Sequence, residues 1–157
     1  MMSNPTDSNG KMERKAIFAG TFDPYTRGHH SIATRALAMF DKVIIAVGYN
    51  SEKSTLLATE ERVDAIRRIY AGEPRIEVAA YEGLTAEFAK QQGASCLLRG
   101  VRSVKDFEYE RDLADINREI SGIETVIMVS EPQFAAISSS VVRELMRHGK
   151  DVSKFLP

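Results

Sequence analysis

Two patterns of hydrophobic and polar positions alternate along this chain. Short, mostly apolar runs recur five times, and between them apolar residues recur every three or four positions. Uninterrupted apolar runs are typical of strands that are covered on both faces, as in a parallel sheet. The five strands predicted in this way cover residues 16–19, 43–47, 76–80, 96–98 and 125–129.

The segments between the strands predict amphipathic helices. The first covers residues 28–40, where Ile32, Ala36 and Phe40 recur at helical spacing. Further helices are predicted over residues 59–71, 84–92, 103–120 and 137–146.

N-cap residues are predicted for two of these helices, and an apolar stripe is predicted for one of them. Thr59 and Ser103 are expected to be N-caps, because their hydroxyls can accept hydrogen bonds from free N–H groups of the first turn. The long helix is expected to carry an apolar stripe formed by Tyr109, Leu113, Ile116 and Ile120.

The alternation of strands and helices predicts an α/β fold. We expect a Rossmann-like, doubly wound, five-stranded parallel sheet with helices on both faces. A chain of 157 residues with 43% hydrophobic residues forms one domain with a full core. Residues 1–13 are polar and lack the apolar run of a signal peptide, so we expect a disordered N-terminal tail followed by a single domain over residues 14–157.

Composition and charge exclude several classes of protein. The net charge of −1 gives no basic field that would attract nucleic acid or an anionic membrane, so an anionic ligand must be held by local groups. No apolar run approaches the roughly 18 residues that a membrane span needs. The single cysteine, Cys96, rules out an intramolecular disulfide and favours a reducing, cytoplasmic compartment. Because Cys96 lies within an apolar strand, we interpret it as a core residue.

Polar and basic residues follow the carboxyl ends of four predicted strands. They are Thr21, His29, Lys53, Arg99, Arg102 and Ser138–Ser140. These ends meet at one edge of a parallel sheet, which is where ligands bind in open α/β folds. Cations and helix N-termini together suit a ligand with several phosphates. Neither the P-loop pattern nor G-x-G-x-x-G is present, so the standard phosphate-binding motifs are excluded.

Each of these residues also has a purely structural interpretation. His29 could simply begin a helix, Lys53 could be a solvated loop residue, and Arg102 could pair with Asp106 one turn later. The serines could act as ordinary N-caps. His30 and His148 are interpreted as packing or surface residues.

Two segments resemble the signatures of a nucleotidyltransferase superfamily. Residues 20–24, followed by Thr26-Arg27-Gly28-His29, resemble the (T/H)-x-G-H signature, and residues 137–143 resemble I-S-S-[ST]-x-x-R. Residues 99–102 and 106–110 resemble the phosphopantetheine adenylyltransferases, as does Lys53 ahead of the helix that begins near Glu60. The resemblance extends from Lys15 to Pro157, so it implies a single nucleotidyltransferase domain.

The resemblance implies adenylyl transfer from ATP to 4′-phosphopantetheine, which gives dephospho-coenzyme A and pyrophosphate. The transfer would proceed by direct in-line attack without a covalent intermediate. Mg²⁺ would be carried by the ATP phosphates, and no protein metal ligand is expected. The resemblance also implies a cytoplasmic homohexamer with coenzyme A as a feedback inhibitor.

The same resemblance assigns roles to individual residues. His29 would stabilise the transition state, and Lys53, Arg99 and Arg102 would act with it. The acceptor substrate would be bound by Thr21, Lys53, Thr85 and Arg99. ATP would be bound by Thr21, Phe22, His29, Gly100, Val101, Arg102, Glu110, Phe134, Ala135, Ala136, Ile137, Ser138, Ser139 and Ser140.

Three alternatives remain open at this point. The first is a sister enzyme, such as a nicotinate-nucleotide adenylyltransferase or a cytidylyltransferase, although the segment from Arg99 to Glu110 speaks against it. The second is a non-catalytic nucleotide-binding or sensor domain with the same fold. The third is a flavodoxin-like carrier, which would be yellow when purified.

Overall fold

The computed structural model describes Thr6 and residues 8–52 and 54–157. Five strands form one all-parallel sheet in the order β3-β2-β1-β4-β5. They are β1 (Lys15–Gly20), β2 (Lys42–Tyr49), β3 (Ile76–Glu82), β4 (Cys96–Val101) and β5 (Glu124–Val129). The predicted number of strands and their parallel arrangement are confirmed.

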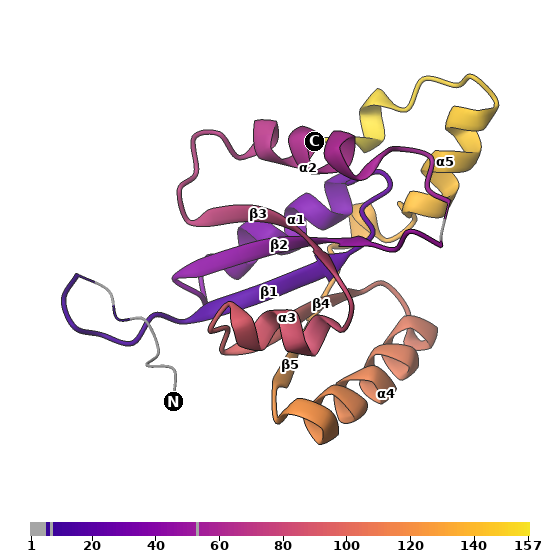
Figure 1. Cartoon of the computed structure of the whole chain (residues 1–157). Coiled ribbons are helices and arrows are strands. Elements are labelled where there is room, and N and C mark those ends of the chain that lie inside the picture. The colour runs from indigo at the N-terminus through magenta and orange to yellow at the C-terminus, as the bar shows by residue number, and fades with distance from the viewer. Residues whose placement is uncertain (1–5, 7, 53) are drawn as a thin grey trace.

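Helices cover both faces of the sheet, as predicted (Figure 1). α1 (Arg27–Ala36) and α2 (Thr59–Ile69) lie on one face, and α3 (Thr85–Gln91) and α4 (Val104–Ser121) lie on the other. The 3₁₀-helix η1 (Pro132–Phe134) follows β5 and leads to α5 (Ser139–Arg147). A last 3₁₀ turn, η2 (Ser153–Phe155), follows α5. In Figure 1, α5 lies beyond the end of the sheet to which the strands point.

Two separate hydrophobic cores, one on each face of the sheet, explain the apolar runs. Successive side chains of a strand point to opposite faces. In β1, Ala16 and Phe18 therefore join the core that includes residues of α1 and α2, and Ile17 and Ala19 join the core that includes residues of α3. Because both faces are covered, all four residues are buried and none of them is polar.

Several element ends differ from the predictions. α1 ends at Ala36 rather than at residue 40, because the N–H groups of Met39 and Phe40 both donate to the Ala36 carbonyl in a tight turn. β4 extends to Val101, so Arg99 lies within the strand rather than after it. Its pairing with β5 continues through this end and stabilises the extended backbone.

The predicted caps are half right. Ser103 is the N-cap of α4, and its side chain accepts a hydrogen bond from the Asp106 N–H. Thr59 is not a cap, because α2 has Ala58 at that position without a side-chain cap. The Thr59 hydroxyl instead accepts a hydrogen bond from Arg62 at 3.0 Å.

Three of the four residues of the predicted apolar stripe of α4 are exposed. The relative exposures of Tyr109, Ile116 and Ile120 are 63%, 59% and 56%. The fourth, Leu113, is half-buried and lines a cavity between α3 and α4 together with Glu110. The helical spacing was correct, but it did not indicate which face would be covered.

The start of the chain adds one short contact. Thr6 and Met12 form an isolated antiparallel bridge, while residues 1–5 and Asp7 lie outside the described residues. The disorder of residues 1–13 and the domain boundary therefore stay predictions. Throughout the described ranges, no helix has both the length and the apolar character needed to cross a membrane.

Candidate active site

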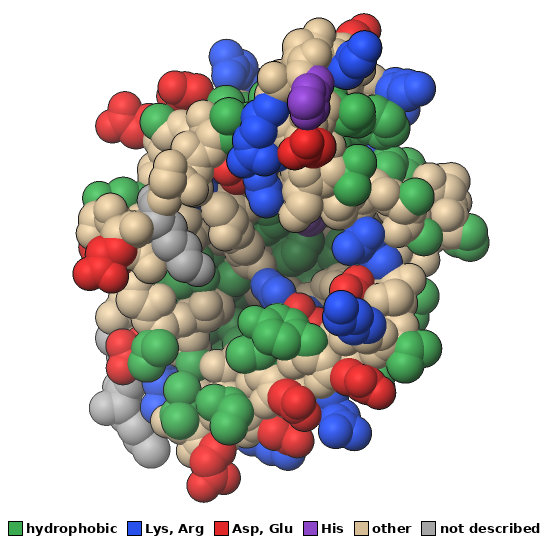
Figure 2. Space-filling model, turned by 90° about the vertical axis from the view of Figure 1, so that its right-hand side faces the viewer, with side chains coloured by type: hydrophobic (Ala, Val, Ile, Leu, Met, Phe, Trp, Pro, Cys, Tyr) green, Lys and Arg blue, Asp and Glu red, His purple; other side chains and the backbone are tan. Residues whose placement is uncertain are grey.

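The candidate site lies beside β1, where the direction in which successive strands are added to the sheet reverses. β1 is bordered by β2 on one side and by β4 on the other, and ligand crevices form outside the carboxyl ends at such a position. A cavity of about 290 Å³ lies there, lined by the ends of β1 and β4 and the starts of α1 and α5. We name it the His29 cavity. Figure 2 looks onto this side of the molecule and shows a hollow with basic side chains around it.

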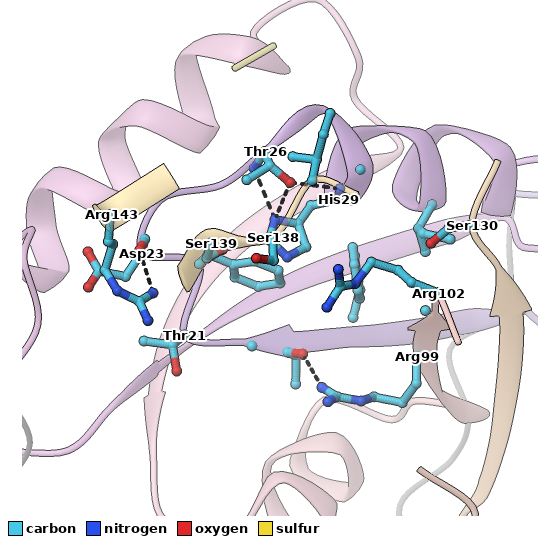
Figure 3. A pocket seen from close by; sticks show the side chains of 18 residues that line it. Thr21, Asp23, Thr26, His29, Arg99, Arg102, Ser130, Ser138, Ser139 and Arg143 are labelled. Carbon is cyan, nitrogen blue, oxygen red and sulfur yellow. Dashed lines mark hydrogen bonds between the residues drawn. The ribbon is translucent and has the colours of Figure 1, made fainter. Parts of the chain in front are cut away.

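His29 is fixed at the N-terminus of α1 by a reciprocal capping box. Its Nδ1 accepts a hydrogen bond from the Thr26 backbone N–H at 2.9 Å, and the Thr26 hydroxyl accepts one from the His29 N–H at 3.4 Å (Figure 3). An Nδ1 that accepts from a backbone N–H carries no proton itself, so the proton of the neutral ring lies on Nε2. The ring therefore has a donor available on its Nε2 side.

His29 is neutral at ordinary pH. Burial lowers the pKa of its imidazole to about 4, and the positive charges of Arg99 and Arg102 lower it in the same direction. His29 can therefore stabilise an anion by hydrogen bonding but does not add a full positive charge to the site.

Arg99 is held by a partner that the sequence did not predict. Its Nε and Nη2 each donate to a carboxylate oxygen of Glu110 at 2.7 Å, and its Nη1 donates to the Ala19 carbonyl at 2.6 Å. The guanidinium has five N–H donors in a fixed fork, so two remain for a ligand. The carboxylate of Glu110 is buried in this ion pair and neutralises part of the expected charge.

Arg102 connects two segments of the cavity wall. Its Nε lies 3.5 Å from a carboxylate oxygen of Asp106, so the ion pair considered from the sequence is present. Its Nη1 donates to the Ala135 carbonyl at 3.2 Å, which ties the segment after η1 to the end of β4. In Figure 3, Arg102 extends into the space between His29 and Arg99.

The loop after β1 is shaped by an aromatic ring beneath His29. Phe22 has a positive φ of 52° and its side chain is 4% exposed. Its ring packs edge-on against the His29 ring, with 5.0 Å between centroids. A Cβ on Gly20 would lie 3.0 Å from this ring, so a larger residue would displace it. Phe22 thus supports His29 with its side chain and offers mainly its backbone to a ligand.

Arg62 is a structural residue of the site that sequence reasoning missed. It is buried, and its guanidinium donates to the carbonyl oxygens of Thr21 and Gly48, which end or follow the two central strands. The signal was present in the sequence, because Arg62 lies four residues before Ile66 on the apolar face of α2. A charged residue on such a face needs buried partners.

The second signature motif is anchored to the first. The Ser139 hydroxyl donates to the Pro24 carbonyl and Arg143 donates to the Asp23 carbonyl, both at 2.8 Å. The Asp23 carboxylate accepts the N–H groups of Leu56 and Leu57 at 2.8 and 2.9 Å. Loops that are far apart in the sequence are thereby held together around the cavity. Arg143 lines the cavity and was missed as a site residue, although it is the arginine of that motif.

The serines of this motif have separate tasks. Ser138 is the N-cap of α5 and accepts a hydrogen bond from the Val141 N–H, which confirms its capping interpretation. The exposed Ser140 lies next to Arg143, whose Nη2 donates to its hydroxyl at 3.3 Å.

The structure gathers about half of the predicted site residues in the His29 cavity. Those that line it are Thr21, Phe22, His29, Arg99, Gly100, Arg102, Ile137, Ser138 and Ser139. Those that do not line it are Thr85, Val101, Glu110, Phe134, Ala135, Ala136 and Ser140. Lys53 lies outside the described residues.

Two neighbouring cavities continue the His29 cavity. A cavity of about 250 Å³, here named the α3–α4 cavity, shares Ala19 and Arg99 with it. It is also lined by Thr85 and Glu110. A smaller cavity of about 170 Å³ shares Thr21 with the first and Gly83 with the second.

Within residues 8–52 and 54–157 no three or more His, Cys, Asp or Glu side chains lie close enough to hold a metal ion. The carboxylates near the His29 cavity are engaged, Asp23 by backbone N–H groups and Glu110 by Arg99.

The residues interpreted as structural behave accordingly. Cys96 is buried, and burial raises the pKa of its thiol to about 11, which confirms the core interpretation. His148 is exposed and pairs with Glu144 at the end of α5. His30 packs against Tyr70.

Comparison with known proteins gives the family. Residues 17–145 match the protein family described as cytidylyltransferase-like. A protein of Phocaeicola vulgatus named phosphopantetheine adenylyltransferase is 51% identical over 144 residues, which cover 92% of this chain and 95% of that protein. A protein of the same name from Porphyromonas gingivalis is 54% identical over 142 residues, covering 90% and 93%. The chain belongs to the phosphopantetheine adenylyltransferase family. The predicted resemblance is confirmed, and the sister-enzyme and flavodoxin-like alternatives are wrong.

A solved structure supports the fold alone. The crystal structure of a bifunctional NMN adenylyltransferase/ADP ribose pyrophosphatase from Francisella tularensis is 13% identical, with a TM-score of 0.68. The similarity covers 92% of this chain and 44% of that one, so this chain spans less than half of that protein.

Proposed function

We propose that this member of the phosphopantetheine adenylyltransferase family transfers the adenylyl group of ATP to the phosphate of 4′-phosphopantetheine, giving dephospho-coenzyme A and pyrophosphate in coenzyme A biosynthesis. The observation that carries the proposal is the continuity of the cavities. A polar cavity with fixed phosphate donors shares Arg99 with a largely apolar one, so one guanidinium borders the space for a nucleotide and the space for an aliphatic arm.

The transfer would be a direct in-line displacement. An oxygen of the acceptor phosphate attacks the α-phosphorus of ATP, and the bond from that phosphorus to the bridging oxygen of the β-phosphate breaks. Pyrophosphate leaves with the electron pair. Two hydroxyls of the cavity wall, Ser138 and Ser139, already bond to backbone groups. This supports a mechanism without a protein nucleophile.

Catalysis would depend on donors that are in place before the substrates arrive. Two anionic groups must approach each other, and preorganised donors are commonly the largest catalytic contribution in such a case. The Nε2–H of His29 would bind an oxygen that gains charge in the transition state, because the Thr26 backbone fixes its ring. Lys53 and Arg102, which also pairs with Asp106, would supply positive charge, and Arg99 would supply its two remaining donors.

The acceptor phosphate would lie near Thr21 and Arg99. Asn50 and Thr55, which flank the position of Lys53 in the sequence, line the smaller cavity together with Thr21. This supports the predicted role of Lys53 as a ligand of the same phosphate.

The α3–α4 cavity would hold the pantetheine arm. Ile17, Leu97 and Leu113 offer apolar walls to its methylene groups. Thr125 also lines this cavity, and its hydroxyl is fully buried and has no hydrogen-bond partner among the described residues. Thr85 lines the same cavity, which supports its predicted contact with the arm.

ATP would lie on the side of the His29 cavity away from the pantetheine arm, between residues 100–102 and the segment from Phe134 to Ser140. Thr21 and Phe22 would contact it mainly through their backbone. Mg²⁺ would enter with ATP, bound to the phosphate oxygens, where it would offset their negative charge. The engaged state of Asp23 and Glu110 supports this substrate-borne mode of metal binding.

The remaining predictions belong to the same proposal. The exposed apolar residues of α4, among them Tyr109 and Ile116, support assembly into a homohexamer. Coenzyme A would inhibit because it contains the same pantetheine arm. The free, buried thiol of Cys96 supports action in the cytoplasm.

The test is pyrophosphate release from ATP and Mg²⁺ with 4′-phosphopantetheine, in parallel with pantetheine that lacks the phosphate. We expect release only with the phosphorylated acceptor. The absence of release with 4′-phosphopantetheine, when ATP still binds, would contradict the function and favour the non-catalytic nucleotide-binding alternative.

A further inference from the structure

The His29 ring packs against three aromatic residues, of which Phe18 and Phe22 also line the cavity and Tyr25 does not. Tyr25 stacks on it, with ring centroids 5.3 Å apart and ring planes 26° from parallel. Phe22 contacts it edge-on, and Phe18 lies 6.2 Å away between centroids. The Thr26 N–H and hydroxyl lie 2.9 and 3.2 Å from Nδ1 and fix one edge of the imidazole, but contacts to one ring nitrogen leave the rest of the ring free to tilt. A stacked ring limits that tilt.

Tyr25 is itself anchored by a chain of hydrogen bonds. Its hydroxyl lies 2.6 Å from that of Tyr70, and the Tyr70 hydroxyl lies 2.9 Å from Nδ1 of His30. His30 also stacks on Tyr70, with centroids 5.4 Å apart. Burial raises the pKa of Tyr25 well above its usual value and that of Tyr70 to about 12, so both hydroxyls keep their protons at neutral pH.

Packing alone does not explain these hydroxyls. Tyr25 and Tyr70 are 5% and 7% exposed, and a buried hydroxyl is unfavourable unless it is hydrogen-bonded. Phenylalanine would fill the same space without that penalty. The hydroxyl pair adds a fixed orientation, because it joins the loop before α1 to the end of α2, 45 residues later.

We propose that Tyr25 is a positioning residue for His29, and that Tyr70 and His30 hold Tyr25 in the orientation that stacks on the imidazole. The proposal rests on the catalytic role of His29 in the proposed function. Tyr25 does not line the His29 cavity, so it would act only through the histidine. The end of α2 thereby supports the ring, while Arg62 at the start of the same helix supports the Thr21 carbonyl.

The first test compares Tyr25→Leu with Tyr25→Phe. Tyr25→Leu removes the stacking face, and we expect kcat to fall at least about tenfold while the KM for ATP stays within about twofold. Tyr25→Phe restores the face without the hydroxyl, and we expect it to recover only part of the lost kcat, because the hydrogen bond to Tyr70 no longer orients the ring. Phe40→Leu is the matched control, because Phe40 packs against the same core and has no ring contact with His29. It should lower thermal stability without lowering kcat.

The second test observes His29 directly by ¹⁵N nuclear magnetic resonance of the imidazole. The wild-type protein should show a protonated Nε2 and an unprotonated Nδ1 as a single species. Tyr25→Leu should shift or broaden these signals, and Phe40→Leu should leave them unchanged. Unchanged His29 signals in Tyr25→Leu, or a kcat equal to that of Phe40→Leu, would overturn the proposal.

The two tests also separate this inference from the proposed function. If the wild-type protein released no pyrophosphate, the proposed function would fail, but the imidazole signals would still measure the dependence of His29 on Tyr25. If turnover occurred and only the signals stayed unchanged, the positioning role alone would fail.

Discussion

The His29 cavity and the α3–α4 cavity share Arg99 and Ala19 but are built in different ways. In the first, the chemical groups are fixed by other parts of the protein, as Thr26 fixes the imidazole and Asp23 fixes Arg143. In the second, aliphatic walls surround a buried hydroxyl, that of Thr125, which has no partner among the described residues.

The difference indicates a division of labour. A chemical step that depends on charge needs donors that do not reorganise, so those groups are already satisfied and held. A flexible, largely apolar substrate arm is recognised by shape and by a few polar contacts, so that cavity needs few fixed polar groups. Variants in the two cavities should therefore change different kinetic constants.

The largest effect is expected for His29→Ala. Loss of one preorganised donor lowers kcat by about a hundred- to a thousandfold, while the KM for ATP should change by less than about threefold. Steady-state pyrophosphate release measures both constants. His148→Ala, at an exposed position, is the control and should match the wild type. A large rise in KM with an unchanged kcat would place His29 in ground-state binding instead.

Arg99 borders both cavities, so removing its ion pair with Glu110 tests the role of the residue that joins them. Arg99→Met leaves the buried Glu110 carboxylate unpaired, and we expect the free energy of unfolding to fall by about 3 kcal/mol. The double variant Arg99→Met/Glu110→Met should recover most of that loss, because no buried charge remains, and should still be inactive. Urea denaturation together with turnover separates the two effects. Activity in the double variant would show that Arg99 serves only to hold Glu110.

Stability should also depend on pH through His29. Its pKa is about 4 in the folded protein, and an unfolded histidine titrates near 6.5. As the pH falls from about 6.5 to 4, the unfolded chain binds a proton that the folded chain does not, so the folded state loses up to about 3 kcal/mol. Above pH 7 this contribution is absent. Denaturation across this range should show a shallower decline in His29→Ala, and equal slopes would contradict the lowered pKa.

A smaller effect is expected from narrowing the α3–α4 cavity. Ala114→Leu adds volume to its wall and should raise the KM for 4′-phosphopantetheine about tenfold, with the KM for ATP and kcat nearly unchanged. Ala38→Leu, at an exposed position after α1, is the matched control. A rise in the KM for ATP instead would place the nucleotide in this cavity.

The smallest effect is expected for Thr125→Val. The substitution removes a buried hydroxyl that has no partner in the described protein, so stability should stay the same or rise by up to about 1 kcal/mol. Because the hydroxyl has almost no accessible surface, the KM for 4′-phosphopantetheine should stay within about twofold. Thermal unfolding and acceptor titration measure the two quantities, and a clear loss of stability or a severalfold rise in this KM would contradict the expectation.

The sequence predicted the parts of the molecule that depend on local pattern. Apolar runs located the five strands, and short motifs located His29 and Ser138 at helix starts. The hydrogen-bond partners of the site residues were not predictable. Glu110, for example, reaches Arg99 only through the packing of α4 against the sheet. The same holds for Tyr70, which meets Tyr25, 45 residues earlier in the sequence, within the same core.

The α3–α4 cavity shows why some sites have no sequence signal. Its walls consist mainly of residues such as Leu84, Leu97 and Ala114, which are common in any core, and only the tertiary arrangement turns them into a binding surface. The exposed stripe of α4 was unpredictable for a similar reason, because exposure also depends on the tertiary arrangement. Spacing showed that Ile116 and Ile120 share a face of the helix, but not that this face lies away from the sheet.

The most direct test of the division of labour is a double-mutant cycle on His29→Ala and Ala114→Leu. The quantity to measure is kcat/KM for 4′-phosphopantetheine in the wild type, both single variants and the double variant. If the two cavities act separately, the losses should add, with a coupling free energy below about 0.5 kcal/mol. A double variant no worse than His29→Ala alone would show that both residues act on one step, and the account would be wrong.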